Sequence, residues 1–287
     1  MRVHNVFIDA SFVGYRSRTP HFMELGYKSS SKKWVATGTI YSFFRDLVNL
    51  IELYGQDTRY AVAWDTRPTV RREMSEDYKS NRRVGMTDEE EQALLTMRRQ
   101  FKEISVLLRY AGIPQFMCPG YEADDVLATL ADMSKGRTVI VVRDKDLYQT
   151  INRAVRLYDF HGIKDYKWFT ENFGIEPHQW IDVQSLAGDS TDNVKGITGI
   201  GIKTAIKLVR AYGDLDSVVE KSNCVSDKDK EVVCTARKLV ELKKHLLLDY
   251  IEPRKNIPVL KALLINKQMK NIVNRLDAFR GLSSPLF

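Results

Sequence analysis

Three short apolar runs, each ending in an aspartate, constrain the fold of this chain more than any other feature. The runs cover residues 3–9, 60–65 and 138–144, and they end at Asp9, Asp65 and Asp144. Continuous apolar runs of this length are typical of strands buried on both faces of a parallel sheet. Between them, apolar residues recur at helical spacing over residues 40–54 and 94–108. Strands that alternate with helices predict an α/β fold with a mostly parallel central sheet flanked by helices.

Two segments interrupt this alternation. Residues 15–36 mix basic, aromatic and small polar residues and predict a loop. Residues 66–92 begin with a dense set of basic residues and end in an acidic run that is typical of a helix start. From about residue 176 onward the pattern is helical, with no further clear strand. We therefore expect an α/β core in residues 1–187, interrupted at about 66–92, and a helical region in residues 188–287.

The charge of the chain is unevenly distributed. The net charge is +7 overall, but residues 195–287 alone carry +8 and residues 1–194 carry −1. This excess predicts contact between the C-terminal third and a polyanion, with a solvated basic surface as the alternative. No apolar run approaches the roughly 18 residues that span a bilayer, and the N-terminus lacks a signal-peptide pattern. Three cysteines are too few for a zinc site or a disulfide framework, so we expect a cytoplasmic protein without a membrane partner.

Carboxylates collect around the predicted strand ends. Because the carboxyl ends of parallel strands meet at one edge of a sheet, Asp9, Asp65 and Asp144 should converge there. Six more carboxylates stand in short acidic motifs, namely Glu122, Asp124, Asp125, Asp146, Asp189 and Asp192. Each alone has an ordinary alternative as a turn or cap residue. Two carboxylates ~5 Å apart repel by about 3 kcal/mol at an effective dielectric constant of 20, so a cluster requires cations. Oxygen ligands without nearby His or Cys favour Mg²⁺ or Mn²⁺, and two such ions are typical of phosphodiester hydrolysis.

A glycine-rich turn follows the last acidic pair. Gly196, Gly199 and Gly201 precede Lys203 and Thr204 at the start of an apolar helix. Such a turn exposes backbone N–H groups that can hold a phosphate. It lacks the spacing of a nucleotide-binding loop, so ATP binding is not expected. The pattern predicts a helix-hairpin-helix that grips a duplex backbone without reading its sequence, with a purely structural helical turn as the alternative.

The basic insertion combines an aromatic residue with several cations. Tyr78 is placed to stack on an unpaired base. Lys79 and Arg82 are placed to contact phosphates or to stabilise the transition state, and Arg83 adds a further cation. The alternative is a basic loop in solvent.

The order of these motifs resembles the 5′-nuclease, or flap endonuclease, superfamily. The likeness is to bacteriophage 5′→3′ exonucleases and to the 5′-nuclease domain of bacterial DNA polymerase I. The matching segments are FIDAS around Asp9, AWD ending at Asp65, DYKSNR (77–82), YEADDVLATLA (121–131), DKD (144–146) and GDSTDNVKGITGIGIKTA (188–205). They span roughly residues 3–215. The segment beyond about residue 215 follows no pattern of the family, and Arg143 stands where polymerase-linked members often have a small residue.

The resemblance implies a PIN-like 5′-nuclease core with a helical arch and a helix-hairpin-helix. It implies two Mg²⁺ ions, which Mn²⁺ can replace, bound among Asp9, Asp65, Glu122, Asp124, Asp125, Asp144, Asp146, Asp189 and Asp192. The residues expected to act in catalysis are Asp9, Asp65, Lys79, Arg82, Asp125 and Asp144. Lys79 and Arg82 would stand at the base of the arch and contact the scissile phosphate. The hairpin would hold the downstream duplex, with K⁺ bound at the turn.

The implied function is a structure-selective 5′→3′ exonuclease and flap endonuclease. Its substrates would be 5′ flaps, nicked or gapped duplexes and RNA primers. We expect a monomer in the cytoplasm of a bacterium or of a phage-infected host, with a polymerase or a single-strand-binding protein as candidate partners. One alternative is a non-catalytic DNA-junction binding protein, which would lack some acids or Lys79. The other is a PIN-type ribonuclease, which ordinarily lacks the helix-hairpin-helix.

Overall fold

A central sheet organises the computed structural model, which describes residues 2–16, 25–29 and 31–282 apart from the side chain of Arg83. In this part of the chain, seven strands are paired in the order β8-β7-β6-β1-β4-β5-β9. Their bounds are β1 Asn5–Asp9, β4 Arg59–Ala63, β5 Gln115–Met117, β6 Thr138–Val141, β7 Val155–Tyr158, β8 Ile163–Lys164 and β9 Asp249–Ile251. The five inner strands are parallel, and β8 and β9 are antiparallel edges.

The mostly parallel α/β fold expected from the sequence is confirmed. The three apolar runs form β1, β4 and β6, which are neighbours at the centre of the sheet. Asp9 is the last residue of β1 and is paired with Ala63 at the end of β4. Asp65 and Asp144 follow the ends of β4 and β6 by two and three residues. All three aspartates therefore leave the sheet at the same edge.

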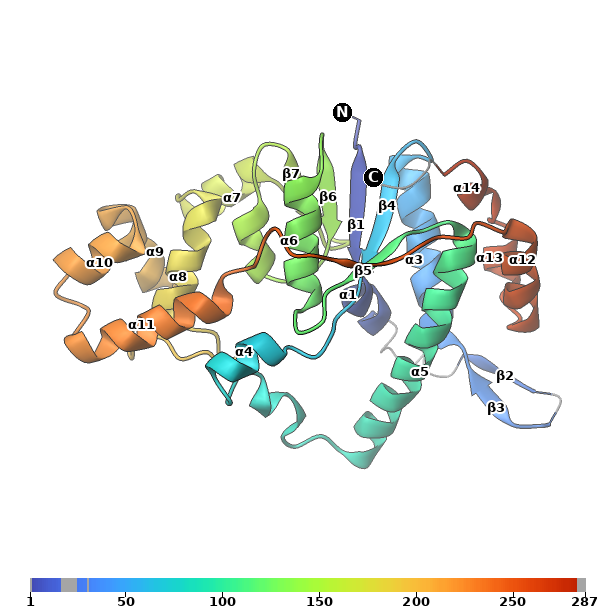
Figure 1. Cartoon of the computed structure of the whole chain (residues 1–287), viewed down its shortest axis with the longest axis horizontal. Helices are drawn as coiled ribbons and strands as arrows, with labels where there is room; N and C mark the ends of the chain where they lie inside the picture. The colour runs from blue at the N-terminus through green and yellow to red at the C-terminus, as the bar shows by residue number, and fades with distance from the viewer. Residues whose placement is uncertain (1, 17–24, 30, 283–287) are drawn as a thin grey trace.

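Helices cover both faces of the sheet (Figure 1). One buried core lies between the sheet and α6 (Ala123–Met133) and continues into α8 (Trp180–Ala187) and α9 (Ile202–Tyr212). The other core lies under α3 (Gly38–Tyr54) and α5 (Asp88–Ala111). Because successive strand residues face opposite sides, Phe7 packs in the first core and Ile8 in the second.

The remaining helices and 3-10 turns complete the described chain. They are α1 Ala10–Tyr15, α4 Thr69–Met74, α7 Tyr166–Phe173, α10 Leu215–Lys221, α11 Asp227–Val240, α12 Ile257–Asn266, α13 Lys270–Val273 and α14 Asp277–Arg280, with 3-10 turns η1 Ser80–Arg83, η2 Asp146–Thr150 and η3 Pro177–Gln179. The insertion comprises α4, η1 and the start of α5, where Thr87 and Glu90 form a capping box. In Figure 1 this insertion runs below the sheet from α4 to α5.

Two expectations about secondary structure are wrong. Within the segment expected to be a loop, β2 (Gly26–Lys28) and β3 (Trp34–Ala36) form an antiparallel hairpin. Gly26 permits this pairing, because a Cβ there would lie 2.4 Å from the carbonyl oxygen of Val35. Residues 17–24 and 30 of that segment lie outside the described residues. The C-terminal region also contains a strand, β9, whose three residues are too few for any periodicity to reveal.

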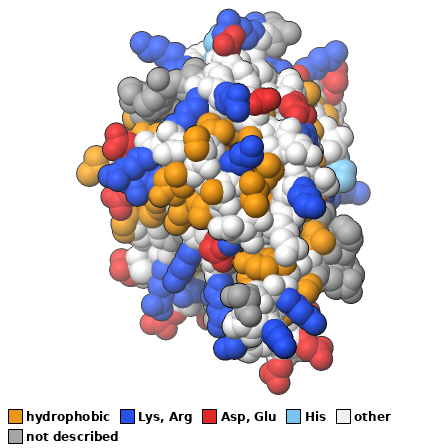
Figure 2. All heavy atoms as spheres, turned by 90° about the vertical axis from the view of Figure 1, so that its right-hand side faces the viewer, with side chains coloured by type: hydrophobic (Ala, Val, Ile, Leu, Met, Phe, Trp, Pro, Cys, Tyr) orange, Lys and Arg blue, Asp and Glu red, His pale blue; other side chains and the backbone are white. Residues whose placement is uncertain are grey.

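The C-terminal region is divided between the two ends of the molecule. Helices α9 to α11 form one end of the molecule, and the chain then returns across the sheet edge as β9 to the opposite end (Figure 1). There Leu260, Leu264 and Phe279 of α12 and α14 are buried in the core under α3 and α5. Figure 2 shows that end of the molecule, where hydrophobic side chains are interspersed with Lys and Arg. The last part of residues 188–287 is therefore packed on the α/β core. No helix of the described chain is long and apolar enough to cross a membrane.

Candidate active site

The strand-end aspartates are fixed by local backbone donors. Asp9 caps α1 and accepts a hydrogen bond from the backbone N–H of Phe12 at 3.0 Å. Asp65 accepts one from the backbone N–H of Ala123 at 2.9 Å, in the first turn of α6, and another from the hydroxyl of Ser11. These contacts join the ends of β1 and β4 to the start of α6.

Burial and mutual repulsion perturb several of these acids. Burial raises the pKa of Asp9 to about 8, and the charges of Asp65 and Asp144 contribute to the rise. The pKa of Asp146 is also raised to about 8, by burial and then by the charge of Asp144. Carboxylates that act on one another in this way lie close together.

The same effects extend to acids from later in the chain. The pKa of Asp124 is raised by burial and then by the charges of Asp144 and Asp9. Burial raises the pKa of Asp144, and the charges of Asp192 and Asp189 add to it. These electrostatic effects link seven of the nine acids, which are Asp9, Asp65, Asp124, Asp144, Asp146, Asp189 and Asp192.

Six of these acids have no cationic partner within ion-pair distance among the described side chains. They are Asp9, Asp65, Asp124, Asp144, Asp146 and Asp189. We name this set the open carboxylates. Of these acids, Asp9 is buried, Asp65 is exposed and the other four are half-buried. Clustered charge of one sign is stabilised by bound cations.

Basic residues of the insertion hold the remaining acids. Lys79 forms ion pairs with Glu122 and, at 3.1 Å, with Asp192. Arg82 contacts the other oxygen of Asp192 at 2.6 Å. Burial alone would raise the pKa of Asp192, but Lys79 and Arg82 lower it below its usual value. The base of the insertion therefore lies directly against the acids. The side chain of Arg83 lies outside the described residues.

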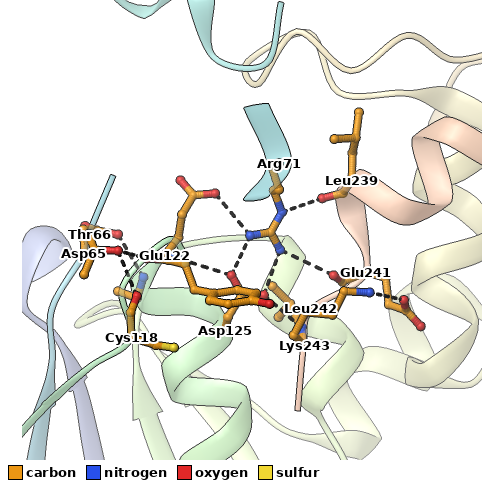
Figure 3. A network of polar contacts seen from close by, with 12 residues as sticks. Asp65, Thr66, Arg71, Cys118, Glu122, Asp125, Leu239, Glu241, Leu242 and Lys243 are labelled. Carbon is orange, nitrogen blue, oxygen red and sulfur yellow. Dashed lines mark hydrogen bonds and ion pairs between the residues drawn. The ribbon is translucent and has the colours of Figure 1, made fainter. Parts of the chain in front are cut away.

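Asp125, expected among the metal ligands, does not join the open carboxylates in this structure, because it is paired with Arg71. The side chain is fully buried and forms a bidentate ion pair with Arg71, at 2.5 and 2.8 Å (Figure 3). It also accepts the backbone N–H groups of Glu122 at 3.3 Å and Lys243 at 2.9 Å. Four donors occupy its two oxygens, so none remains directed at a metal ion.

Tyr78, expected to stack on an unpaired base, is enclosed by protein in this structure. Tyr78 is 3% exposed and packs with Val194, Leu239 and Val240. Its hydroxyl donates to Glu122 at 2.6 Å, and burial raises its pKa. A ring enclosed in this way presents no face to a nucleic-acid base. The basic residues that surround Tyr78 in the sequence are typical of an exposed segment. The side chains that bury Tyr78 come from distant parts of the chain.

The donor set fits a hard divalent cation. All candidate ligands are carboxylate oxygens, as Mg²⁺ and Mn²⁺ prefer. Among the described residues, however, no three His, Cys, Asp or Glu side chains are grouped so that one ion could join them directly. Glu122 and Asp192 are turned toward Lys79 and Arg82 instead. Metal binding would therefore require some of these side chains to reorient.

The glycine-rich turn forms a hairpin between α8 and α9. Ile197 and Ile200 are buried and anchor the turn, whereas Thr198 and Gly199 are exposed at its tip. Gly196 must be glycine, because a Cβ would lie 2.2 Å from the carbonyl carbon of Ala187. Gly201, Lys203 and Thr204 are exposed at the start of α9. The hairpin thus presents free backbone and a lysine to solvent.

Three polar residues of the site were not predicted. Arg71 is buried against Asp125, Gln184 donates to Asp146, and Ser11 donates to Asp65. Ser11 stands two residues after Asp9, which is a local signal. Gln184 lies in an apolar helix segment, where a lone buried amide is the kind of feature that could have indicated a partner.

The sheet, the acids at its carboxyl edge and the basic insertion together define an α/β protein with an acidic site at the carboxyl edge of its sheet. Two family models match the chain: the N-terminal resolvase-like domain of 5′-3′ exonucleases over residues 4–176, and the C-terminal SAM fold of the same enzymes over residues 175–255. The chain belongs to the 5′-3′ exonuclease family, which confirms the resemblance found in the sequence.

Individual relatives agree with this assignment. Thermostable DNA polymerase I of Thermus thermophilus is 34% identical over 258 residues, which cover 86% of this chain and 30% of the polymerase. The 5′-3′ exonuclease of Mycoplasmopsis pulmonis is 30% identical over 281 residues, covering 95% of this chain and 89% of that protein. The structure of T5 5′-exonuclease with bound zinc matches with a TM-score of 0.67 at 19% identity. The match covers 95% of this chain and 100% of the T5 5′-exonuclease chain. The last comparison shows a shared fold.

Proposed function

We propose that this protein is a divalent-metal-dependent, structure-selective 5′-nuclease that hydrolyses phosphodiesters of DNA flaps, nicked or gapped duplexes and RNA primers. The observation that carries the proposal is the set of six open carboxylates beside Lys79 and Arg82. An anionic cluster next to two cations suits metal ions and a phosphate at the same time. The zinc named for T5 5′-exonuclease supports a divalent ion in this fold.

Each group of residues has a separate task in this proposal. The open carboxylates would hold two Mg²⁺ ions, with Glu122 and Asp192 joining when they leave Lys79 and Arg82. Bound divalent ions supply an activated water and stabilise the negative charge that develops on the phosphate. Lys79 and Arg82, when they release these acids, would bind the scissile phosphate, since both end in cations at the edge of the acidic cluster. Asp125 is absent from this ligand set because Arg71 saturates it.

The hairpin would hold the duplex. The exposed turn at Gly199 and the lysine that follows at Lys203 suit a phosphate backbone rather than a base sequence. The surplus positive charge of residues 195–287 supports the same interface. We include K⁺ at the hairpin in the proposal, because the resemblance to the 5′-nuclease superfamily implies it. Its test is duplex affinity in K⁺ compared with tetramethylammonium at equal ionic strength, and equal affinities would remove K⁺ from the proposal.

A labelled 5′-flap duplex tests the activity. We expect cleavage near the flap junction with Mg²⁺ or Mn²⁺, products that carry a 5′-phosphate, and no cleavage in EDTA. A matched single-stranded RNA should be cut poorly, which separates this activity from a PIN-type ribonuclease. Flap binding without cleavage under every divalent ion would favour a junction-binding protein instead.

A further inference from the structure

Arg71 is a buried cation that the proposed chemistry does not use. Its side chain is 7% exposed and lies in α4, the first helix of the insertion. Figure 3 shows its guanidinium between the acids of α6 and the end of α11. Nη1 and Nη2 contact both oxygens of Asp125, and Nε donates to the carbonyl oxygen of Leu239 at 2.8 Å. Burial opposes the charge of Arg71, but the contacts with Asp125 raise its pKa, so the cation is retained.

The carbonyl contacts belong to the C-terminal end of α11. Leu239 and Glu241, whose oxygens accept from Arg71 at 2.8 and 3.4 Å, stand where helix carbonyls have no partner within the helix. A cation at this end also interacts favourably with the helix dipole. Arg71 therefore attaches the base of the insertion to α11, and α11 packs against α8, which leads to the hairpin.

The contact with Asp125 acts on the start of α6. Asp125 accepts the backbone N–H of Glu122 and so closes the first turn of the helix. That turn carries Glu122 and Asp124, and Asp65 binds the N–H group of Ala123 within it. The guanidinium also contacts Glu122 directly, at 3.5 Å. The insertion, the first turn of α6 and the end of α11 thus meet at a single side chain.

We propose that Arg71 is a positioning residue for the nuclease reaction, because it fixes the first turn of α6 and the base of the insertion relative to α11. This inference rests on the proposed function. Arginine suits the position because its planar fork reaches a carboxylate and two carbonyl groups in different directions, which the single ammonium of lysine does not. Arg71 acts through Asp125 and Glu122.

The variant Arg71→Lys keeps the charge and removes the fork. Its matched control is Arg275→Lys, because Arg275 forms a bidentate ion pair with Glu52 (3.1 and 2.6 Å) on the other core of the molecule. Both variants of the full chain are compared in cleavage of a 5′-flap duplex, and in Mn²⁺ binding measured by electron paramagnetic resonance without DNA. For Arg71→Lys we expect kcat to fall about 10-fold or more, KM to change less than about 3-fold, and Mn²⁺ affinity to fall about 10-fold. Arg275→Lys should match the unaltered chain in all three.

A structural role alone would give a different result. Arg71→Lys would then lower the melting temperature while kcat, KM and Mn²⁺ affinity of the folded protein stayed at the values of Arg275→Lys, and this outcome overturns the inference. Failure of the proposed function is distinguishable, because the unaltered chain would then neither cut the flap nor bind Mn²⁺.

Asp125→Asn provides a second route if Arg71→Lys does not fold. Asparagine has the same shape and retains one acceptor oxygen, but it lacks the charge that Arg71 requires. We expect the same pattern of low kcat, unchanged KM and weakened Mn²⁺ binding. The double variant should be no worse than the worse single variant, since both changes break one contact. Effects on kcat that multiply would show that the two residues act independently and would contradict the inference.

Discussion

Single carboxylates in this site differ in what surrounds them. Asp192 has Lys79 and Arg82 as partners and a lowered pKa, whereas Asp146 has other carboxylates as neighbours and a pKa raised to about 8. Asp125 is paired with Arg71 and accepts hydrogen bonds from the backbone N–H groups of Glu122 and Lys243. The acids therefore form two groups. Some are paired with a cationic side chain of the protein, and the open carboxylates have no such partner among the described side chains.

Asp146→Asn should abolish cleavage and stabilise the metal-free protein. The amide removes a ligand but also removes one repelling charge beside Asp144. We expect at least a 10³-fold lower kcat, flap binding in EDTA within about 3-fold, and a melting temperature at pH 8 higher by roughly 2–4 °C, which is about 1 kcal/mol at this chain length. Single-turnover cleavage and calorimetry provide these values. Asp57→Asn, at an exposed ion pair with Arg2, is the control and should leave cleavage and melting temperature unaltered. Loss of flap binding as large as the loss of rate would contradict this division of roles.

Lys79→Ala should slow the reaction without releasing the substrate. Lys79 is 8% exposed and holds Glu122 and Asp192, so its loss leaves two acids uncompensated and removes a cation from the phosphate. We expect kcat about 10²-fold lower with KM changed less than about 3-fold. Lys167→Ala, which breaks an exposed ion pair with Glu171, serves as the control in the same steady-state assay. A normal kcat with a raised KM would show that Lys79 only binds the flap.

Among the elements, the hairpin between α8 and α9 can be tested for its role in duplex binding by substituting a single glycine. Gly199 has φ +85°, and a Cβ added there would meet no atom within 4 Å; the same holds for Gly213, at φ +96° beyond the far end of α9. A side chain at either position is strained, because both φ values are positive. Gly199→Val should weaken duplex binding about 10-fold or more, whereas Gly213→Val should lose stability but bind the duplex normally. Fluorescence anisotropy with a labelled duplex measures the difference, and equal affinities would exclude the hairpin from the interface.

The elements predicted from sequence are those whose signal is local and long. The runs that became β1, β4 and β6 were recognisable because they lie at the buried centre of the sheet. The edge strands β8 and β9 have two and three residues, so neither alternation nor a continuous run could appear in them. Their existence depends on the neighbouring strand rather than on their own sequence.

Contacts between residues that are distant in the chain could not be predicted from the sequence. The convergence of the strand-end acids follows from topology and was predicted, whereas the ion pair of Asp125 in α6 was not. Arg71 is held by Leu239, 168 residues later, and Asp125 by Arg71, 54 residues earlier. Tyr78 is buried by Val194 and Leu239 in the same way. A segment rich in basic residues is expected to be exposed to solvent when only its own sequence is considered. The buried anionic side chains that neutralise this segment lie elsewhere in the chain.

At the scale of the whole molecule, the acidic cluster links stability to pH and to metal ions. The pKa values of Asp9 and Asp146 are raised from 3.8 to about 8 on folding. Between these values the folded protein holds protons that the unfolded chain has released, so the free energy of unfolding decreases as pH rises. We expect the melting temperature of the metal-free protein to fall by roughly 5 °C or more from pH 5.5 to pH 8, as measured by calorimetry in EDTA.

Divalent ions should reverse this dependence. A cation that replaces the bound protons binds the folded state only, and it binds best when the carboxylates are ionised. Mg²⁺ at about 10 mM should therefore raise the melting temperature more at pH 8 than at pH 5.5. The Asp146→Asn protein should show a smaller pH dependence and a smaller response to Mg²⁺ than the unaltered chain. If the metal-free protein were instead most stable at pH 8, the acids would be compensated by protein cations, and the open carboxylates would not be the site of metal binding.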